Sequence, residues 1–253
     1  MKRYAVERRG CLIEYQPRLI LPENDNKYYI RKAAKGYNPA IIGYPQHRYL
    51  DVLSNCVGYA IGRFNEIGGY NECKYLKPVN AERFIDYAIP QGLKISQAPQ
   101  LGACAVWQGG DSSQGSDGAG HVAIVEQIND DGSIITSESG YGDKRPFWTS
   151  YRQKGKGNWG QKTGVYKFLG FILNPAIVEI PAGVDWVTIK RREGGGYEYI
   201  NVPGIMKNNR WYIQLRSIDE ALQVCKVSYN SEEGIPEVYI NEVEKDTSYD
   251  SYR

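Results

Sequence analysis

The hydrophobic residues between positions 54 and 69 follow the spacing of an amphipathic helix. Apolar side chains recur every three or four residues, at Val57, Ala60, Ile61, Phe64 and Ile67. This spacing places them on one face of an α-helix. Ser54 or Asn55 is a suitable N-cap, and Gly68-Gly69 is a natural stop. The pattern therefore predicts a helix that carries Cys56 in its first turn.

Two apolar runs farther along the chain predict a β-hairpin. His121–Ile128 and Ser133–Glu138 have the composition of strands, and Asn129–Gly132 between them is rich in turn-forming residues. The first strand thus opens on a histidine, and the second closes on a glutamate.

The loop length of this hairpin decides whether the histidine and the glutamate meet. A loop of two or four residues pairs Ala123 with Glu138. His121 and Glu138 are then diagonal neighbours on one face, about 7–8 Å apart between Cα atoms. A loop of three or five residues would place them on opposite faces. Asn129, Ser137 or a backbone carbonyl would then be the candidate group that orients His121.

The pattern changes near Asn174. A strand-like run, Gly164–Leu173, closes the first region, and Asn174–Gly183 reads as a linker because it contains two prolines and ends on glycine. Short strand-like runs follow at Trp186–Ile189, Tyr197–Val202, Trp211–Leu215 and Glu237–Ile240. A helix is predicted at Ser217–Gln223, with Ser217 as its N-cap. The predicted organisation is a catalytic domain over residues 1–173, a linker over 174–183 and a small β-rich domain over 184–253.

The chemistry of the first region centres on one thiol and one imidazole. A cysteine becomes a useful nucleophile when a base or a local field makes it a thiolate. The free N–H groups and the dipole at a helix start supply such a field for Cys56. The chain holds only two histidines in 253 residues, so His121 is the prime candidate base, with Glu138 to orient it. The alternative for Cys56 is a buried structural residue, because free cysteine is among the most buried residue types.

Four stretches in fixed order resemble the CHAP family, the cysteine/histidine-dependent amidohydrolase and peptidase module of phage endolysins and bacterial wall hydrolases. They are Asn55–Ala60, Ala98–Trp107, Gly120–Val125 and Ser137–Gly140. The resemblance implies a papain-like α+β fold, in which the nucleophile helix packs on an antiparallel sheet. It also implies that Cys56, His121 and Glu138 are the catalytic residues of peptidoglycan amide hydrolysis, by an N-acetylmuramoyl-L-alanine amidase or a peptidoglycan endopeptidase.

The chain departs from the family pattern at three places. Many relatives have aspartate where Ala103 stands and asparagine where Gly140 stands. Some phage members carry a calcium loop just before the cysteine, but here Tyr44–Asp51 contains one carboxylate. Calcium prefers six to eight oxygen ligands, several of them carboxylates. We therefore predict no calcium at that position and no other metal or cofactor.

The charge and composition of the chain exclude several classes of binding partner and site. A net charge of +2 does not indicate nucleic acid, and no run of this chain, whose mean hydropathy is −0.52, has the length of a membrane span. The five cysteines are odd in number and form no Cys-x-x-Cys, which argues against a disulfide framework or a zinc site. The oligomeric state stays open.

The start of the chain lacks the apolar segment of a secretory signal. With the resemblance, this indicates a phage endolysin that stays in the host cytoplasm until lysis and then acts on the bacterial cell wall. Residues 184–253 would bind that wall through exposed aromatic faces. The alternative is a structural virion or surface component that carries a wall-cutting module, for which long coiled-coil or repeat segments are expected.

Overall fold

The chain divides into two compact units in the computed structural model. The residues described are 4–8, 11–31, 50–109, 118–142, 145–161, 165–180, 183–193, 196–207, 210–213, 225–230 and 235–240. One unit is Tyr15–Val178, and the other combines Met1–Glu14 with Glu179–Arg253. This division assigns the first fourteen residues to the second unit, whereas the sequence pattern groups them with the catalytic domain.

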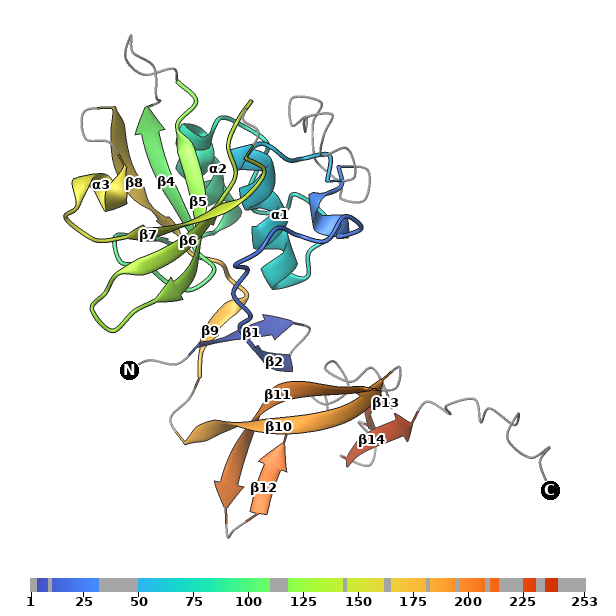
Figure 1. Ribbon diagram of the computed structural model, residues 1–253. Coiled ribbons are helices and arrows are strands. Elements are labelled where there is room, and N and C mark those ends of the chain that lie inside the picture. The colour runs from blue at the N-terminus through green and yellow to red at the C-terminus, as the bar shows by residue number, and fades with distance from the viewer. Residues whose placement is uncertain are drawn as a thin grey trace. The chain divides into compact units, whose positions relative to one another are not determined.

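A six-stranded sheet is the centre of the unit Tyr15–Val178 (Figure 1). Its strands, in spatial order, are β3 (Ile95–Ser96), β8 (Tyr166–Ile172), β4 (Cys104–Gly109), β5 (His121–Ile128), β6 (Ile134–Glu138) and β7 (Trp148–Arg152). Every neighbouring pair is antiparallel. The predicted α+β fold with an antiparallel sheet is thereby confirmed.

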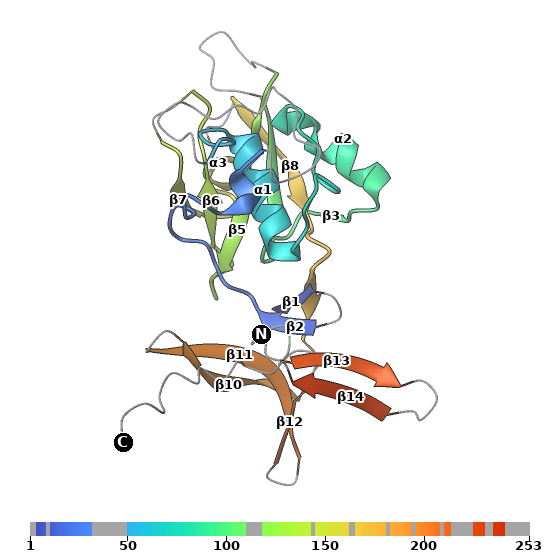
Figure 2. The ribbon, with the colours of Figure 1, turned by 90° about the vertical axis from the view of Figure 1, so that its right-hand side faces the viewer.

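The predicted helix is α1 (Cys56–Gly68), and it lies across one face of the sheet, where it contacts β5 and β6 (Figure 2). Asn55 is its N-cap, because its side chain accepts a hydrogen bond from the N–H of Gly58. Gly69 ends the helix in the left-handed conformation, with φ of 70°. All five residues of the predicted apolar face are buried. Among its described residues, this unit has further helical segments at η1 (Lys27–Tyr29), η3 (Ala81–Arg83), α2 (Phe84–Ala88), η4 (Ile89–Gln91) and α3 (Gly157–Gly160).

The β5–β6 hairpin has a longer loop than the one predicted. Ile128 pairs with Ile134, so residues 129–133 connect the two strands. The expectation of two or four loop residues is therefore wrong. The turn is closed by side chains: Ser133 donates to Asp131 through both its N–H and its hydroxyl. A regular ladder from this loop would have turned the glutamate away from the histidine.

A β-bulge corrects the register. The pairing shifts by one residue at Glu126, so that Ile124 lies opposite Ser137. The extra residue reverses the alternation of side chains along β5. His121 and Glu138 consequently project from the same face of the sheet.

That face also carries a hydrophobic core. The cluster consists of Ala103, Ala105, Trp107, Ala123, Val125, Ile134, Trp159 and Phe171. Trp159 comes from α3, which contacts β7 and β8. The aromatic rings of this cluster pack closely against the end of β5, so the position of His121 is rigidly held.

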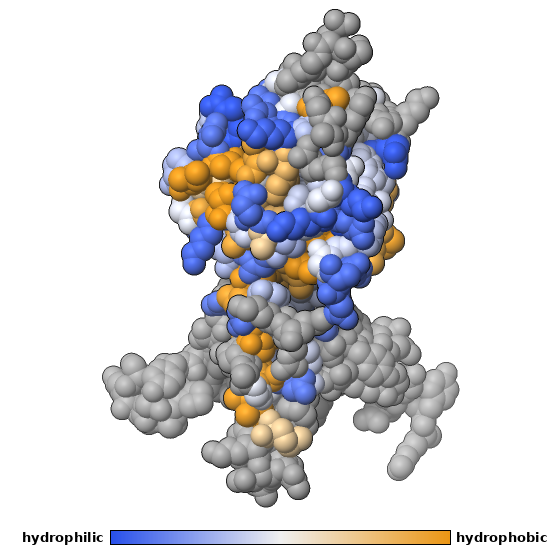
Figure 3. Space-filling view, turned by 90° about the vertical axis from the view of Figure 1, so that its left-hand side faces the viewer, coloured by the Kyte–Doolittle hydropathy of each residue, from blue (hydrophilic) through white to orange (hydrophobic). Residues whose placement is uncertain are grey.

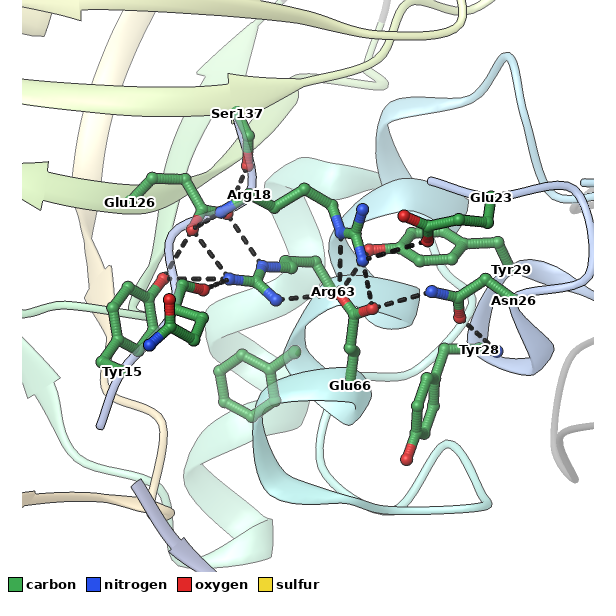
Figure 4. Close-up of polar contacts among 12 residues, drawn as sticks. Tyr15, Arg18, Glu23, Asn26, Tyr28, Tyr29, Arg63, Glu66, Glu126 and Ser137 are labelled. Atoms are coloured by element: carbon green, nitrogen blue, oxygen red, sulfur yellow. Dashed lines mark hydrogen bonds and ion pairs between the residues drawn. The ribbon is translucent and has the colours of Figure 1, made fainter. Parts of the chain in front are cut away.

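The bulge residue Glu126 is the centre of a buried polar cluster (Figure 4). Its carboxylate accepts hydrogen bonds from Nε and Nη2 of Arg63 in α1, both at 2.9 Å. The hydroxyls of Tyr15 and Ser137 donate to it at 2.7 Å each, and the N–H of Arg18 donates at 2.9 Å. Through Tyr15 and Arg18, the cluster joins the segment that precedes η1 to both α1 and β5.

Glu66 of α1 extends the same cluster. It accepts from Nη1 of Arg63 at 2.8 Å and from Nε of Arg18 at 2.9 Å. Asn26 and Tyr29 complete its shell, at 2.8 and 3.1 Å. Residues 15–29 are thus fastened to α1 by charge as well as by packing.

The second unit consists of strands in the described residues. β1 (Tyr4–Arg8) and β2 (Cys11–Glu14) form a hairpin, and β2 contacts β11. A three-stranded sheet contains β10 (Val184–Glu193), β11 (Gly196–Lys207) and β12 (Arg210–Ile213), and a separate hairpin contains β13 (Cys225–Asn230) and β14 (Ile235–Ile240). The predicted helix at Ser217–Gln223 lies outside the described residues.

The segment predicted as a linker begins with structure. Asn174 is 1 % exposed, and its side chain donates to the carbonyl of Phe64 at 3.0 Å. It also accepts from the N–H of Ala176. β9 (Ile177–Glu179) follows, where the chain passes from one unit to the other. The residues that separate the units are therefore held at their first end by the catalytic unit.

The surface of the unit Tyr15–Val178 carries both hydrophobic and hydrophilic side chains. On the face in Figure 3, hydrophobic side chains gather between hydrophilic borders. Within the described ranges, no helix is long and apolar enough to cross a membrane.

Candidate active site

Cys56 stands at the first residue of α1 and is partly exposed. The preceding residue fixes it from two sides: the Asn55 side chain caps the helix, and the Asn55 N–H donates to Oγ of Ser139 at 3.1 Å. The end of β6 therefore holds the start of the nucleophile helix. At this position the helix leaves the N–H of Cys56 without an intrahelical acceptor.

His121 and Glu138 meet as the first and last residues of β5 and β6. Nε2 of His121 lies 2.7 Å from Oε2 of Glu138. The imidazole also faces Cys56, whose side chain is among the causes that raise the pKa of His121, and both residues line one cleft. Since Nε2 faces the glutamate, Nδ1 is the nitrogen that remains for the thiol. The structure thus brings all three sequence-predicted residues together in one chain of contacts.

The site favours a charged imidazole. Burial by itself lowers the pKa of His121, but hydrogen bonds with Cys56 and Glu138, together with the charge of Glu138, raise it to about 9. Burial raises the pKa of Glu138, yet the hydrogen bond with His121 and the charge of Arg152 hold it well below its usual range. The site therefore places a charged imidazole beside the N-terminus of α1, where Cys56 stands.

Arg152 and Thr136 hold the second oxygen of Glu138, and sequence analysis identified neither. Nη2 and Nε of Arg152 donate to Oε1 at 2.7 and 3.2 Å, and Oγ1 of Thr136 donates to it at 2.7 Å. Glu138 is 1 % exposed. Thr136 had a readable signal, since it lies two residues before Glu138 on one face of the strand. Arg152 had none, because only the β6–β7 pairing brings it near.

Aromatic rings surround the imidazole. Trp148 is stacked on it, with centroids 6.4 Å apart and planes at 9°, and Trp107 lies on it at 5.9 Å. Tyr166 meets it edge-on at 6.5 Å. These rings cover most of the imidazole and limit its rotation, while 13% of the side chain stays exposed at the cleft.

Gly120 is required by the close approach of two backbones. It has φ of 71°, and a Cβ there would lie 2.4 Å from the carbonyl oxygen of Trp107 and 2.8 Å from the nitrogen of Glu82. No other residue fits such a position. The glycine before His121 in the sequence motif thus lets β5 start against its neighbours.

A cleft of about 1020 Å³ opens over these residues. Cys56, His121 and Glu138 line it, together with Pro78–Ala81 from one side and Gly140, Tyr141, Trp148 and Tyr166 from others. This volume is at the upper end of the range of small-molecule sites in proteins. The second histidine of the chain, His47, lies outside the described residues.

Two further cysteines, Cys73 and Cys104, are buried. Cys104 is 0 % exposed in β4, and burial raises the pKa of its thiol well above the usual value. Cys73 is also buried, and burial raises its pKa to about 11. Both are thus held as buried thiols, whereas Cys56 is partly exposed.

No group of three or more metal-ligating side chains occurs within the ranges that the structure describes. Most of Tyr44–Asp51 lies outside those ranges, so the absence of calcium there stays a prediction. Asp51 itself accepts from the N–H of Arg31.

Comparison with known proteins gives a family match. The family model of the CHAP domain matches residues 45–140, which include Cys56, His121 and Glu138. A similar solved structure is that of N-acetylmuramoyl-L-alanine amidase from Staphylococcus aureus, at 24% identity and a TM-score of 0.32. The match covers 40% of this chain and 27% of that chain, so the present chain spans about a quarter of the amidase. No curated protein matches the chain. Residues 45–140 therefore match the CHAP domain family.

Proposed function

We propose that this protein hydrolyses an amide bond of bacterial peptidoglycan with Cys56 as nucleophile and His121 as base and acid. The observation that carries the proposal is the chain of contacts from Cys56 through His121 to Glu138, at the wall of an open cleft within a CHAP domain. The same arrangement serves an N-acetylmuramoyl-L-alanine amidase or a peptidoglycan endopeptidase.

Acylation uses the charge pair at the site. The Cys56 thiolate attacks the carbonyl carbon, and the electron pair of the C=O bond moves to its oxygen. The N–H of Cys56 is aimed at this oxygen from the helix start. When the pair returns, the C–N bond breaks, the His121 imidazolium gives its proton to the leaving amine, and a thioester remains.

Deacylation reverses the role of the histidine. Neutral His121 takes a proton from water, whose oxygen attacks the thioester. The C–S bond breaks, the carboxylic acid product leaves, and the thiolate–imidazolium pair is restored. Glu138 keeps its charge throughout and stabilises the imidazolium, as the aspartate of a serine-protease triad does.

We also propose an endolysin role, in which the protein stays in the host cytoplasm until lysis and residues 184–253 direct it to the wall. The support is the β-rich second unit beside a compact catalytic unit. A virion or surface component is the alternative. Its test is location: the chain would copurify with particles instead of remaining free in the lysate.

The bond that is cut can be identified from the products. Purified Gram-positive walls are digested with the wild-type protein and with Cys56→Ala, and the released muropeptides are sequenced by mass spectrometry. A new free amine on the alanine next to muramic acid indicates an amidase, and one within the stem or cross-bridge indicates an endopeptidase. Equal release by Cys56→Ala, or release of new reducing sugars alone, would overturn the proposal.

A further inference from the structure

We propose that Arg152 is a positioning residue that holds Glu138 in the orientation at which Glu138 receives His121. The inference rests on the proposed function, but its contacts stand by themselves. Arg152 is the last residue of β7 and is 5 % exposed. It lies beyond the stretch that matches the CHAP family model, which ends at residue 140.

Arg152 hydrogen-bonds only one of the two oxygens of Glu138. Its Nη2 and Nε occupy Oε1, while Oε2 is left to Nε2 of His121. A carboxylate held at only one oxygen can rotate about its terminal bond. Rotation would break both hydrogen bonds from Arg152 and the one that Thr136 donates to Oε1, so Oε2 stays aimed at the imidazole.

The guanidinium is itself fixed on every side. Nη1 donates to the carbonyl of Trp159 at 2.7 Å, and Nε also donates to Oγ1 of Thr136 at 2.9 Å. The Trp107 ring lies 4.8 Å from its central carbon. Arginine suits this place because its planar fork meets several acceptors at once, which a lysine ammonium does not.

Arg152 contacts Glu138 although the two residues are not paired between β6 and β7. Arg152 pairs with Ile134, whereas Trp148 pairs with Glu138. The Arg152 side chain therefore runs back along the sheet to reach the carboxylate. The charged and polar groups that face His121 are then Cys56 from α1, Glu138 from β6 with Arg152 behind it, and Tyr166 from β8.

The chain offers a matched control in Arg63. It is also 5 % exposed, and it also donates from Nε and Nη2 to a glutamate that is 1 % exposed, Glu126. Arg63→Lys therefore imposes a similar structural loss away from His121. Arg152→Lys keeps the charge at the site and removes only the fork.

The test is the pH dependence of kcat and KM for Arg152→Lys, with Arg63→Lys beside it. We expect kcat of Arg152→Lys to fall about 10- to 100-fold, as it does when outer partners of an active-site group are removed, with KM unchanged. A loosened Glu138 stabilises the imidazolium less, so the alkaline limb should move to lower pH. Arg63→Lys should keep the wild-type profile at temperatures where it is folded. An unchanged profile for Arg152→Lys, or a rise in KM alone, would overturn the proposal.

A second readout is independent of activity. The chain holds two histidines, so His47→Gln identifies the ring signals of His121 by nuclear magnetic resonance. We expect His121 to titrate at lower pH in Arg152→Lys than in the wild type and in Arg63→Lys. If the wild-type protein digests no wall, the proposed function fails, while this titration still decides the role of Arg152.

In the Glu138→Gln background, Arg152→Lys should cost no further activity, because its effect passes through the carboxylate. Additive losses would mean that Arg152 acts on the substrate instead.

Discussion

Two buried arginine–glutamate pairs in the catalytic unit have nearly the same geometry and different neighbours. Arg152 meets Glu138 at 2.7 Å, and Arg63 meets Glu126 at 2.9 Å. Each guanidinium also lies against an aromatic ring, at 4.8 and 5.6 Å. Burial and charge alone therefore do not tell which of the pairs serves chemistry.

The difference lies in the third partner of each carboxylate. Glu138 shares its charge with an imidazole that opens onto the cleft. Glu126 is closed in by Tyr15 and Ser137 hydroxyls, and burial followed by the charge of Glu126 raises the pKa of Tyr15 well above its usual value. The first pair thus helps to raise the pKa of His121 in the cleft to about 9. The second pair fastens segments of the chain together.

The largest expected effect is at the thiol. Cys56→Ala removes the nucleophile, so wall digestion should fall by at least about 10⁴-fold, while the melting temperature stays close to that of the wild type. Turbidity clearing of purified walls measures the first, and circular dichroism the second. Cys11→Ser and Cys225→Ser are the controls and should keep most activity. Substantial clearing by Cys56→Ala would remove Cys56 from the mechanism.

Replacing each glutamate separates the two pairs most directly. Glu138→Gln should lower kcat by about 10²- to 10⁴-fold and move the alkaline limb to lower pH, because His121 loses the charge that raises its pKa to about 9. Glu126→Gln should leave the limb in place and lower the free energy of unfolding by about 3–5 kcal/mol, since it breaks a buried pair. Assays are run below both melting temperatures. A shifted limb in Glu126→Gln would merge the two roles.

The stability of the catalytic unit should depend on pH through His121 at the alkaline end and through Glu66 at the acid end. The raised pKa of His121 contributes stability that is fully present below about 6.5 and is lost as pH rises through about 9, on the order of 3 kcal/mol. Burial raises the pKa of Glu66, but hydrogen bonding by Arg18 and the charge of Arg63 lower it to about 2, so its contribution is lost as pH falls from about 4.5. Urea midpoints across pH should show that His121→Gln abolishes only the alkaline loss, and Glu66→Gln part of the acid loss.

Local patterns predicted the parts of the site that depend on neighbours in sequence. The helix at Cys56 follows from apolar spacing and an N-cap, and Asn55 is that N-cap. The strand that opens on His121 follows from its composition. These features are set within a few residues, so the sequence shows them without the fold.

The parts that the sequence did not reveal depend on contacts far along the chain. The loop length was wrong, and the bulge at Glu126 that compensates for it is held by Arg63 and Tyr15, 63 and 111 residues away. Arg152 likewise reaches Glu138 only through strand pairing. The strand β11 also continues past Val202, where the predicted strand ended, and includes Pro203. Its pairing with β12 begins only after this proline, at Gly204. No periodicity encodes such partners.

The stretch matched by the family model is smaller than the folding unit. Residues 15–29 complete the polar cluster on Arg63 and Glu66, yet the match begins at residue 45. A fragment 45–178 should therefore unfold at lower urea than fragment 15–178, by about 3 kcal/mol or more, because buried charges lose partners. Equal midpoints would show that the cluster fastens the segment without stabilising the unit.

The smallest expected effect concerns targeting, and it tests the second unit. A fragment ending near Asn174 should keep its activity on solubilised peptidoglycan but lose about 100-fold in potency on whole cells, because it loses a second attachment. Full-length Cys56→Ala should pellet with purified walls without cutting them, and so should a fragment from Gly183 onward. Since Met1–Glu14 belongs to the same compact unit, the comparison of these two proteins shows whether β1 and β2 are needed. If both stay in the supernatant with every Gram-positive wall tested, the unit does not bind walls, and an assembly role becomes the better explanation of its strands.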